Sequence, residues 1–268
     1  MKSYREVVGD GGSDILGQAA AREARLRTRM ASIAHKFAVV SGKGGVGKST
    51  VSVNLAAALA MQGHKVGILD ADINKPCVAR MLGVRDRTLM LGVGGIVPKA
   101  GPLGMKFVSS VKRKAAARKH RHTWLGTVEA SALNEFLTDT LWGKLDFLII
   151  DLPPGPQRPP LHEVLPDCDG ALVVTVPSNV VELAEARSAA LAQREQTVLC
   201  GLVENMAGHP CKRHRPQVLG SIPFDVRIAG CCDRGLPFVI AHPQAPAARV
   251  MMKIAARMIQ SSARRPRD

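Results

Sequence analysis

Residues 41–50, SGKGGVGKST, constrain the fold of this chain more than any other feature. They match the phosphate-loop pattern G-x-x-x-x-G-K-[ST] from Gly42 to Ser49. The apolar, β-branched run at 35–40 predicts a buried strand before the loop, and the Ala/Leu-rich run at 50–63 predicts a helix after it. A strand, a glycine loop and a helix N-terminus direct backbone N–H groups and the positive end of the helix dipole at an anion.

The same loop predicts how a nucleoside triphosphate would be held. Lys48 is expected to reach the β- and γ-phosphates, and the Ser49 hydroxyl is expected to bind Mg²⁺. ATP and Mg²⁺ are therefore the expected cofactors. The other residues predicted to cradle the nucleotide are Gly42, Gly44, Gly45, Val46, Gly47 and Thr50.

Three acidic residues fall at the ends of predicted strands. Asp70 and Asp72 end the run at 64–72, and Asp151 ends the run LDFLIID at 145–151. In α/β folds, ligands bind at the carboxyl ends of the strands. We expect Asp70 and Asp151 to complete the Mg²⁺ site with Ser49, and Asp72 to orient the attacking water or to sense the metal. The alternative is that such aspartates cap the helix that follows.

The order of the predicted elements indicates the fold class. Strands alternate with helices along the chain, which implies a mostly parallel sheet covered by helices on both faces. Hydrophobic residues make up 46% of the 268 residues, enough for one large α/β domain. We predict a basic helical extension at 1–34, a single phosphate-loop NTPase domain at 35–262 and a basic tail at 263–268.

The charge distribution leaves several kinds of partner open. The formal net charge is +15, and part of it lies in the basic segment 111–122. That segment has no aromatic residue until Trp124, so a solvated loop or an acidic protein partner fits it better than nucleic acid. The C-terminal helix at 246–262 is basic and amphipathic, which suits core packing more often than a membrane surface. No apolar signal segment is found at the N-terminus, which predicts a cytoplasmic protein.

These motifs together resemble the Mrp/ApbC family of P-loop ATPases, which carry iron–sulfur clusters. The shared landmarks are SGKGGVGKST, VGILDADINKPCVARMLGV, WGKLDFLIIDLPPG, GLVENM and LGSIPFD, in family order over about residues 30–260. The early Lys43 is typical of the deviant loop of the wider MinD/ParA/nitrogenase iron-protein class. That resemblance implies ATP hydrolysis by a homodimer, with Lys43 reaching the partner's nucleotide. It also implies that Asn205 binds the adenine, with Pro223 nearby, and that apo iron–sulfur proteins are the clients.

The chain departs from the family where the cluster would bind. The family motif C-P-x-C supplies two thiolates, whereas here Cys211 is followed by His214 in place of the second cysteine. Two Cys-x-x-His pairs across a dimer could hold an iron–sulfur cluster or Zn²⁺. The alternatives are a nucleotide-switch adaptor that has lost the cluster, and a ParA/MinD-like positioning ATPase.

Overall fold

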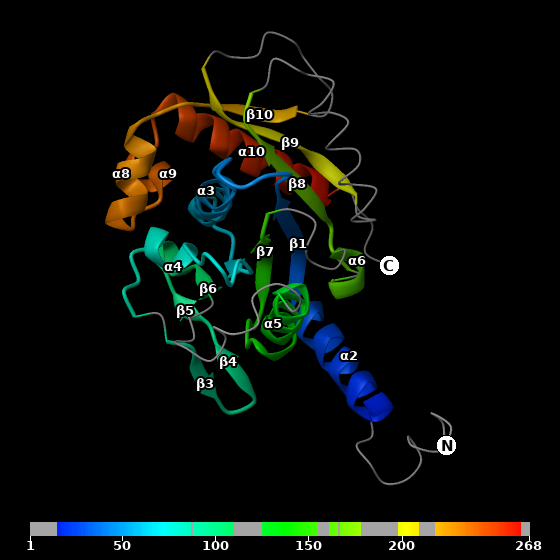
Figure 1. Ribbon diagram of the computed structural model, residues 1–268. Coiled ribbons are helices and arrows are strands. Elements are labelled where there is room, and N and C mark those ends of the chain that lie inside the picture. Colours follow the sequence, from blue (N-terminus) through cyan, green and yellow to red (C-terminus); the bar gives the residue numbers. More distant parts are fainter. Residues whose placement is uncertain are drawn as a thin grey trace.

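The computed structural model describes residues 15–86, 88–109, 125–154, 161–165, 167–177, 198–208 and 218–263. Within them an eight-stranded sheet runs through the middle of the molecule (Figure 1), in the order β10-β9-β8-β1-β7-β2-β6-β5. Neighbouring strands are parallel, except that β5 is antiparallel to β6. The predicted α/β fold with a mostly parallel sheet is therefore confirmed.

The elements follow the alternation seen in the sequence. The strands of the large sheet are β1 Ile33–Val40, β2 Val66–Asp70, β5 Lys99–Ala100, β6 Lys106–Ser109, β7 Leu145–Asp151, β8 Gly170–Thr175, β9 Leu199–Ala207 and β10 Val218–Pro223. The helices are α2 Ile15–Ala31, α3 Lys48–Met61, α4 Val78–Met81, α5 Leu125–Asp139, α6 Leu161–Val164, α8 Arg227–Arg234, α9 Phe238–Ala241 and α10 Pro246–Ala263, with a 3₁₀ turn at Pro102–Gly104.

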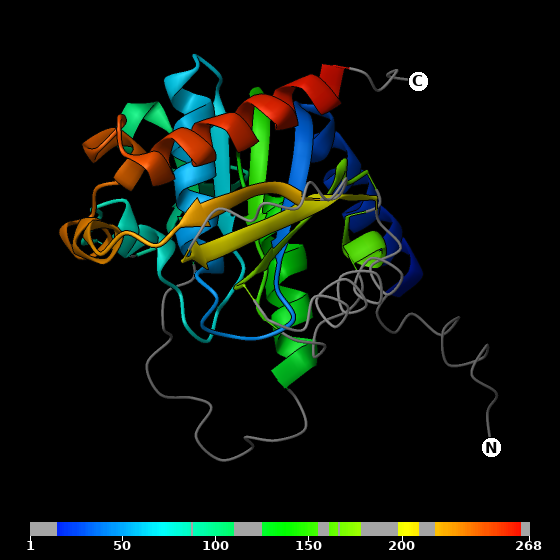
Figure 2. The same ribbon diagram turned by 90° about the horizontal axis from the view of Figure 1, so that it is seen from above.

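Helices cover both faces of the sheet, because the central strands are apolar on both sides. In β1, Phe37 and Val39 pack into one core with α3 and α10, while Ala38 and Val40 pack into a second core with α2 and α5. Figure 2 shows the sheet between α10 and α5. This two-sided burial is typical of parallel strands.

The C-terminal helix α10 closes the first core. Met251, Ile254 and Met258 are buried on the face that meets β10 and α3. A Cβ atom on Gly220 would lie 2.9 Å from the Ile254 side chain, so the glycine allows the helix to approach the sheet closely. The prediction of core packing for this helix is confirmed. None of the described helices is long and apolar enough to cross a membrane.

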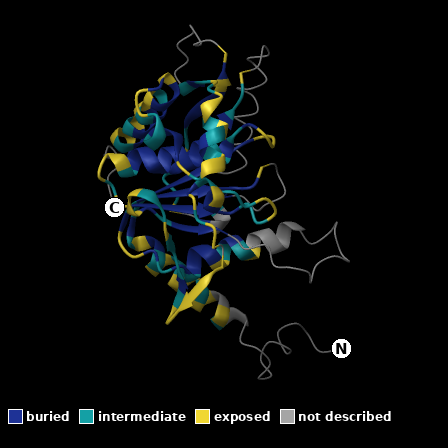
Figure 3. Ribbon diagram, turned by 90° about the vertical axis from the view of Figure 1, so that its left-hand side faces the viewer, coloured by how far each residue is buried: buried dark blue, intermediate teal, exposed yellow. Residues whose placement is uncertain are grey.

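A small hairpin projects beside the large sheet. It consists of β3 Met90–Gly92 and β4 Gly95–Val97, and a bridge from Ile96 to Thr140 ties β4 to the end of α5. Figure 3 shows buried residues concentrated in the sheet and its helices, and β3 exposed.

Several predicted features lie outside the described residues. They are the basic segment 111–122 and nearly all of the basic tail. The division into an extension, a domain and a tail therefore stays a prediction. The structure does place Met30, near the end of α2, in the second core.

Candidate nucleotide-binding site

The phosphate loop connects β1 to α3 at the carboxyl edge of the sheet. Gly45 and Gly47 both have φ of 81°, a left-handed conformation that favours glycine. Val46 between them is buried and anchors the loop, whereas 42–45 are exposed. The N-cap residue of α3 is Gly47, which makes no side-chain capping hydrogen bond. The first N–H groups of α3 therefore have no side-chain acceptor from the N-cap, as a phosphate-binding helix end requires.

Asn205 holds this loop from the neighbouring strand β9. Its Nδ2 donates a hydrogen bond to the Val46 carbonyl at 2.9 Å. A Cβ atom on Gly47 would lie 2.2 Å from the same Nδ2, so only glycine fits there without displacing Asn205. The adenine contact predicted for Asn205 stays a prediction, as does the contact for Pro223, which ends β10.

A buried ion pair lies beneath the loop. The Lys48 Nζ is 2.6 Å from Asp151 Oδ1, with the lysine side chain 7% exposed and the aspartate 0% exposed. Ser52, one turn after Lys48 on α3, donates to the same oxygen at 2.8 Å. Asp151 Oδ2 is buried and has no hydrogen-bond partner among the described residues. Buried polar atoms are nearly always paired, so this oxygen marks a place for a cation or a bound water.

The sheet register brings the second acid beside the first. Asp70 on β2 is directly opposite Asp151 on β7. Burial, followed by the negative charge of Asp151, raises the pKa of Asp70 to about 7. Asp70 Oδ2 accepts hydrogen bonds from the backbone N–H groups of Cys77 and Val78 and from the Ser109 hydroxyl.

Asp70 thus holds the start of α4, which is the capping role that the sequence left open for strand-end aspartates. Its predicted part in Mg²⁺ binding stays a prediction. Asp72 lies two residues further on and is half-buried, and its Oδ1 accepts the backbone N–H of Lys75 at 3.0 Å. Lys43 is exposed on the phosphate loop. The roles predicted for Asp72 and Lys43 in hydrolysis also stay predictions.

Two cysteines that the sequence did not assign to this site contact the phosphate loop. Burial raises the pKa of the Cys77 thiol to about 11, and the nearby Ser49 hydroxyl offsets part of that rise. The Cys232 Sγ lies 4.0 Å from the Thr50 Oγ1. Only the folded chain brings these residues together, since Cys232 comes from α8. Ser52 could have been found from its helical i,i+4 spacing to Lys48.

The segments that carry the two cysteines also contact each other. Gly83 follows α4 and Gly235 follows α8, and both have left-handed backbones with φ of 75° and 73°. A Cβ atom on Gly235 would lie 2.2 Å from Gly83 Cα. An exposed ion pair joins Arg80 to Asp233 at 2.7 Å. These contacts hold α4 and α8 together beside the first turn of α3.

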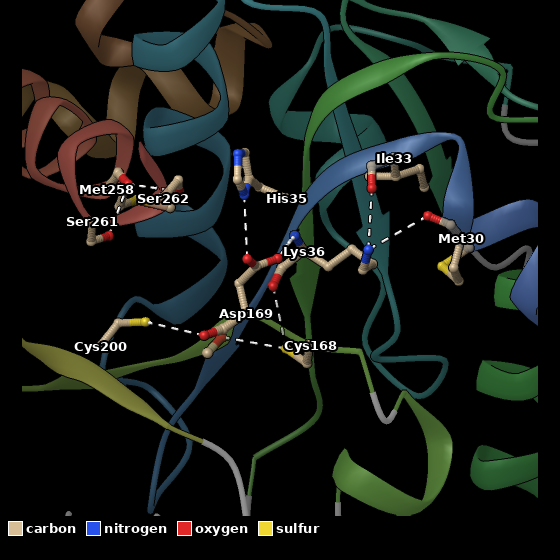
Figure 4. A network of polar contacts seen from close by, with 11 residues as sticks. Met30, Ile33, His35, Lys36, Cys168, Asp169, Cys200, Met258, Ser261 and Ser262 are labelled. Carbon is tan, nitrogen blue, oxygen red and sulfur yellow. Dashed lines mark hydrogen bonds and ion pairs between the residues drawn. The ribbon is translucent and has the colours of Figure 1, made fainter. Parts of the chain in front are cut away.

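A second polar cluster lies at the opposite, amino end of the strands (Figure 4). The Lys36 Nζ donates to the Ile33 carbonyl at 3.1 Å, and the Lys36 backbone N–H donates to Asp169 Oδ2 at 2.7 Å. The Cys168 thiol contacts the Lys36 carbonyl and the Cys200 thiol contacts the Asp169 carbonyl. Because this cluster joins the starts of β1, β8 and β9, its two cysteines are remote from the phosphate loop.

The predicted cluster ligands Cys211 and His214 lie outside the described residues. Among the residues that are described, no group of three or more His, Cys, Asp or Glu side chains could hold a metal ion. For Mg²⁺, the Ser49 hydroxyl and Asp151 Oδ2, which has no partner among the described residues, are the hard oxygen donors that this ion prefers, so the residues present fit it.

The sheet order, the glycine loop and the buried Lys48–Asp151 pair define a P-loop nucleotide-binding protein. The model of the ParA family, described as NUBPL iron-transfer P-loop NTPase, matches residues 32–217. The chain belongs to this family of iron-transfer P-loop NTPases.

Individual relatives agree with that assignment. An iron–sulfur cluster carrier protein of Saccharolobus solfataricus is 38% identical, over 91% of this chain and 89% of its own length. One of Methanocaldococcus jannaschii is also 38% identical, over 82% of this chain and 83% of its own length.

Solved structures show the same fold. A nucleotide-binding protein of Archaeoglobus fulgidus in complex with ADP has a TM-score of 0.64 at 31% identity, covering 79% of this chain and 90% of that one. The cell division ATPase MinD of Pyrococcus furiosus has a TM-score of 0.65 at 22% identity, covering 84% and 98%, and shows likeness of fold alone.

Proposed function

We propose that this chain binds ATP with Mg²⁺, hydrolyses it as a homodimer, and carries an iron–sulfur cluster to client proteins. One observation carries the nucleotide part. It is the buried Lys48–Asp151 pair under the glycine loop, in which the second Asp151 oxygen has no donor in the part of the chain that the structure describes. The relatives support both parts. Two are named iron–sulfur cluster carrier proteins, and the Archaeoglobus structure contains ADP.

Nucleotide binding exchanges the partner of Lys48. In the structure, its ammonium group lies 2.6 Å from Asp151 Oδ1. The β- and γ-phosphates offer the same ammonium group several charged acceptors at the mouth of the loop. When Lys48 turns to them, the Ser52 hydroxyl still donates to Asp151 Oδ1, and the carboxylate is available to the cation. Bound Mg²⁺ neutralises charge on the β- and γ-phosphates, and Ser49 and Asp151 are the residues that would hold it.

Hydrolysis in this proposal needs residues from two chains. Lys43 is exposed on the loop, so it is free to reach the nucleotide of a partner subunit. Asp72 follows β2 at the same edge of the sheet and orients the attacking water. Lys43→Ala should therefore bind ATP but release phosphate slowly. Full phosphate release by this variant at dilutions where the protein is monomeric would exclude the cross-subunit role.

The cargo site is proposed on Cys211 and His214. One chain offers a pair of ligands there, whereas clusters and closed metal sites usually need four. Two chains facing each other across a dimer axis supply that number. The iron–sulfur cluster is the cargo, and the ATPase cycle of the same dimer controls whether it is held or passed on to a client.

Anaerobic reconstitution tests the cargo. We expect about one cluster per two chains, measured as iron and acid-labile sulfide, because each chain supplies half of the ligands. Cys211→Ser should abolish uptake, and His214→Cys should increase it by supplying a second thiolate. A wild-type protein that binds ATP but takes up neither iron nor sulfide would exclude the carrier role and favour the nucleotide-switch adaptor.

A further inference from the structure

The hairpin of β3 and β4 extends the sheet on the side of β6 and leaves one strand edge open. Strand β4 runs through Pro98 into β5, which is the last strand of the large sheet on that side. Strand β3 pairs with β4, and in the part of the chain that the structure describes it has no second neighbour. The backbone N–H and C=O groups on its outer side are therefore available to a further strand.

The side chains of β3 are apolar and face solvent (Figure 3). The exposed fractions are 81% for Leu91 and 54% for Met90, and Val93 at the turn is fully exposed. Residues 88–98 contain no charged side chain. Edge strands that face water are usually protected by lysine, by proline or by a bulge, and β3 contains neither lysine nor proline. Its sequence fits a contact surface better than a solvent-facing edge.

An apolar hollow lies under one face of the hairpin. It is lined by Met90 and Val97 of the hairpin, Phe107 and Val108 of β6, and Ala79 of α4. Met90 and Val97 are paired across the two strands, so their side chains lie on the same face. A strand added beside β3 would place alternate side chains on that face, and one of them could enter the hollow. A free edge beside a pocket for alternate side chains is how sheets bind extended peptides.

The charges around the hairpin indicate the charge of its partner. Helix α2 contains four arginines and one glutamate, and Arg29 Nη2 donates to the Gly94 carbonyl at 2.9 Å, which holds the helix against the turn of the hairpin. Arg85 is exposed shortly before β3. Lys99, which follows β4, is paired with Asp86. Together with the formal net charge of +15, this surface complements an acidic protein.

Two other occupants fit the same surface less well. A second copy of the chain would bring like charges together, because each copy has the same basic surroundings. A lipid bilayer would leave the backbone groups of the open edge without hydrogen-bond partners, since hydrocarbon offers none. An acidic polypeptide satisfies both the charges and the backbone groups.

We propose that β3 is the docking edge for an extended segment of an acidic client protein, which adds to the hairpin as a third strand and places an apolar side chain in the hollow. The bridge from Ile96 to Thr140 and the bond from Arg29 put the turn of the hairpin beside the ends of α5 and α2, which lead into β7 and β1. This is the amino edge of the sheet, so a docked client leaves the phosphate loop accessible. That the partner receives the cluster rests on the proposed carrier function.

A synthetic peptide tests the docking edge without nucleotide or cluster. The probe is a fluorescein-labelled peptide in which valine and threonine alternate between terminal glutamates, and its binding to the full chain is followed by fluorescence anisotropy. We expect saturable binding. Methylation of alternate backbone amides on one edge of the peptide removes hydrogen bonds of the added strand, and replacement of its glutamates by lysines removes the charge match. Each should weaken binding at least about tenfold.

Two variants of one residue separate the apolar contact from the charge. Leu91→Glu and Leu91→Lys both lose the same exposed side chain, so the urea midpoint should stay near that of wild type. Leu91→Glu should weaken binding of the acidic peptide at least about tenfold, and Leu91→Lys should weaken it less, because its charge attracts the peptide. The matched control is Val198→Glu, at an apolar residue that is 57% exposed near the other edge of the sheet, and it should change binding less than about twofold.

Hydrogen exchange locates the bound peptide without any mutation. The amides of residues 88–92 should be protected when the peptide binds, because the added strand accepts their hydrogen bonds. Protection confined to another segment, or equal binding by wild type and Leu91→Glu, would refute the docking edge. Self-association or flotation with anionic vesicles that depends on Leu91, without peptide binding, would overturn the acidic partner in favour of a second copy or a membrane.

Cluster transfer tests whether the docked partner is a client. The reconstituted protein is mixed with the apo form of an acidic [2Fe–2S] ferredoxin, below saturation. Leu91→Glu should slow transfer at least about tenfold and leave cluster uptake by the carrier unchanged. A wild-type protein that takes up no cluster overturns the carrier function itself. Normal uptake with equally fast transfer by Leu91→Glu overturns only the client docking.

Discussion

Removing the charge of Lys48 should destabilise the nucleotide-free protein as well as weaken nucleotide binding. The ammonium group and Asp151 Oδ1 are 2.6 Å apart, and both side chains are almost completely buried. In Lys48→Met the aliphatic stem remains, but within the described ranges Asp151 keeps only the Ser52 hydroxyl as a hydrogen-bond donor. The variant therefore leaves a buried carboxylate without its counter-charge.

The magnitude follows from the burial and the distance. At an effective dielectric constant of about 20, two unit charges at this separation attract by roughly 6 kcal/mol before desolvation is counted. Because both ions also lost their hydration on folding, the net value of the pair is much smaller. Breaking a buried pair by removing one partner costs about 3–5 kcal/mol. We expect Lys48→Met to lose an amount in this range.

A double-mutant cycle in urea, without nucleotide, measures the pair itself. Asp151→Asn should also destabilise, because it leaves Lys48 buried without a negative partner. The double variant Lys48→Met/Asp151→Asn should be less destabilised than the sum of the singles by about 2–3 kcal/mol. Additivity within about 0.5 kcal/mol would show that the two side chains do not interact, and would refute the partner exchange proposed for Lys48.

Two further predictions concern the glycines of the phosphate loop and the buried Asp70. Gly45→Ala and Gly47→Ala both introduce a side chain at φ of 81°, but only the Gly47 side chain would meet Asn205. Gly47→Ala should therefore lose at least about 1 kcal/mol more stability than Gly45→Ala, measured by unfolding in urea. Equal losses would mean that Asn205 can move away at no cost. For Asp70, the pKa is raised from 3.8 to about 7, so its contribution to stability is fully present below pH 4 and is lost as the pH rises through about 7. The free energy of unfolding of the metal-free protein should fall over this interval by at most about 1.4 kcal/mol per pH unit, and Asp70→Asn should remove that slope; an unchanged slope in urea titrations would contradict the assignment to Asp70.

The sequence was sufficient for the phosphate loop because its residues are contiguous and flanked by strong strand and helix signals. It was also sufficient for placing Asp70 and Asp151 at one edge, since both end apolar strands and parallel strands align their carboxyl ends. The packing of α10 against the first core could likewise be predicted, because the helix has an apolar face.

Contacts between distant segments could not be predicted in this way. Asn205 meets Gly47, and Cys232 meets Thr50, only because β9 and α8 return to the loop in the folded chain. No local sequence pattern predicts either of these contacts. The capping of α4 by Asp70 had a local signal in its position at a strand end. The hydrogen bond from the Ser109 hydroxyl to Asp70 could not be predicted, however, because that hydroxyl comes from β6.

The sheet order has a consequence for how the chain is made. Strand β1 leads into the phosphate loop and leaves the ribosome before the other described strands, but its hydrogen-bond partners are β7 at Leu145–Asp151 and β8 at Gly170–Thr175. More than half of the chain must be synthesised before this apolar strand is paired at all, and pairing over such separations is slow. ATP can therefore assist folding only late in synthesis, once Asp151 has emerged, and nascent chains that stall earlier expose β1 to aggregation or to chaperones.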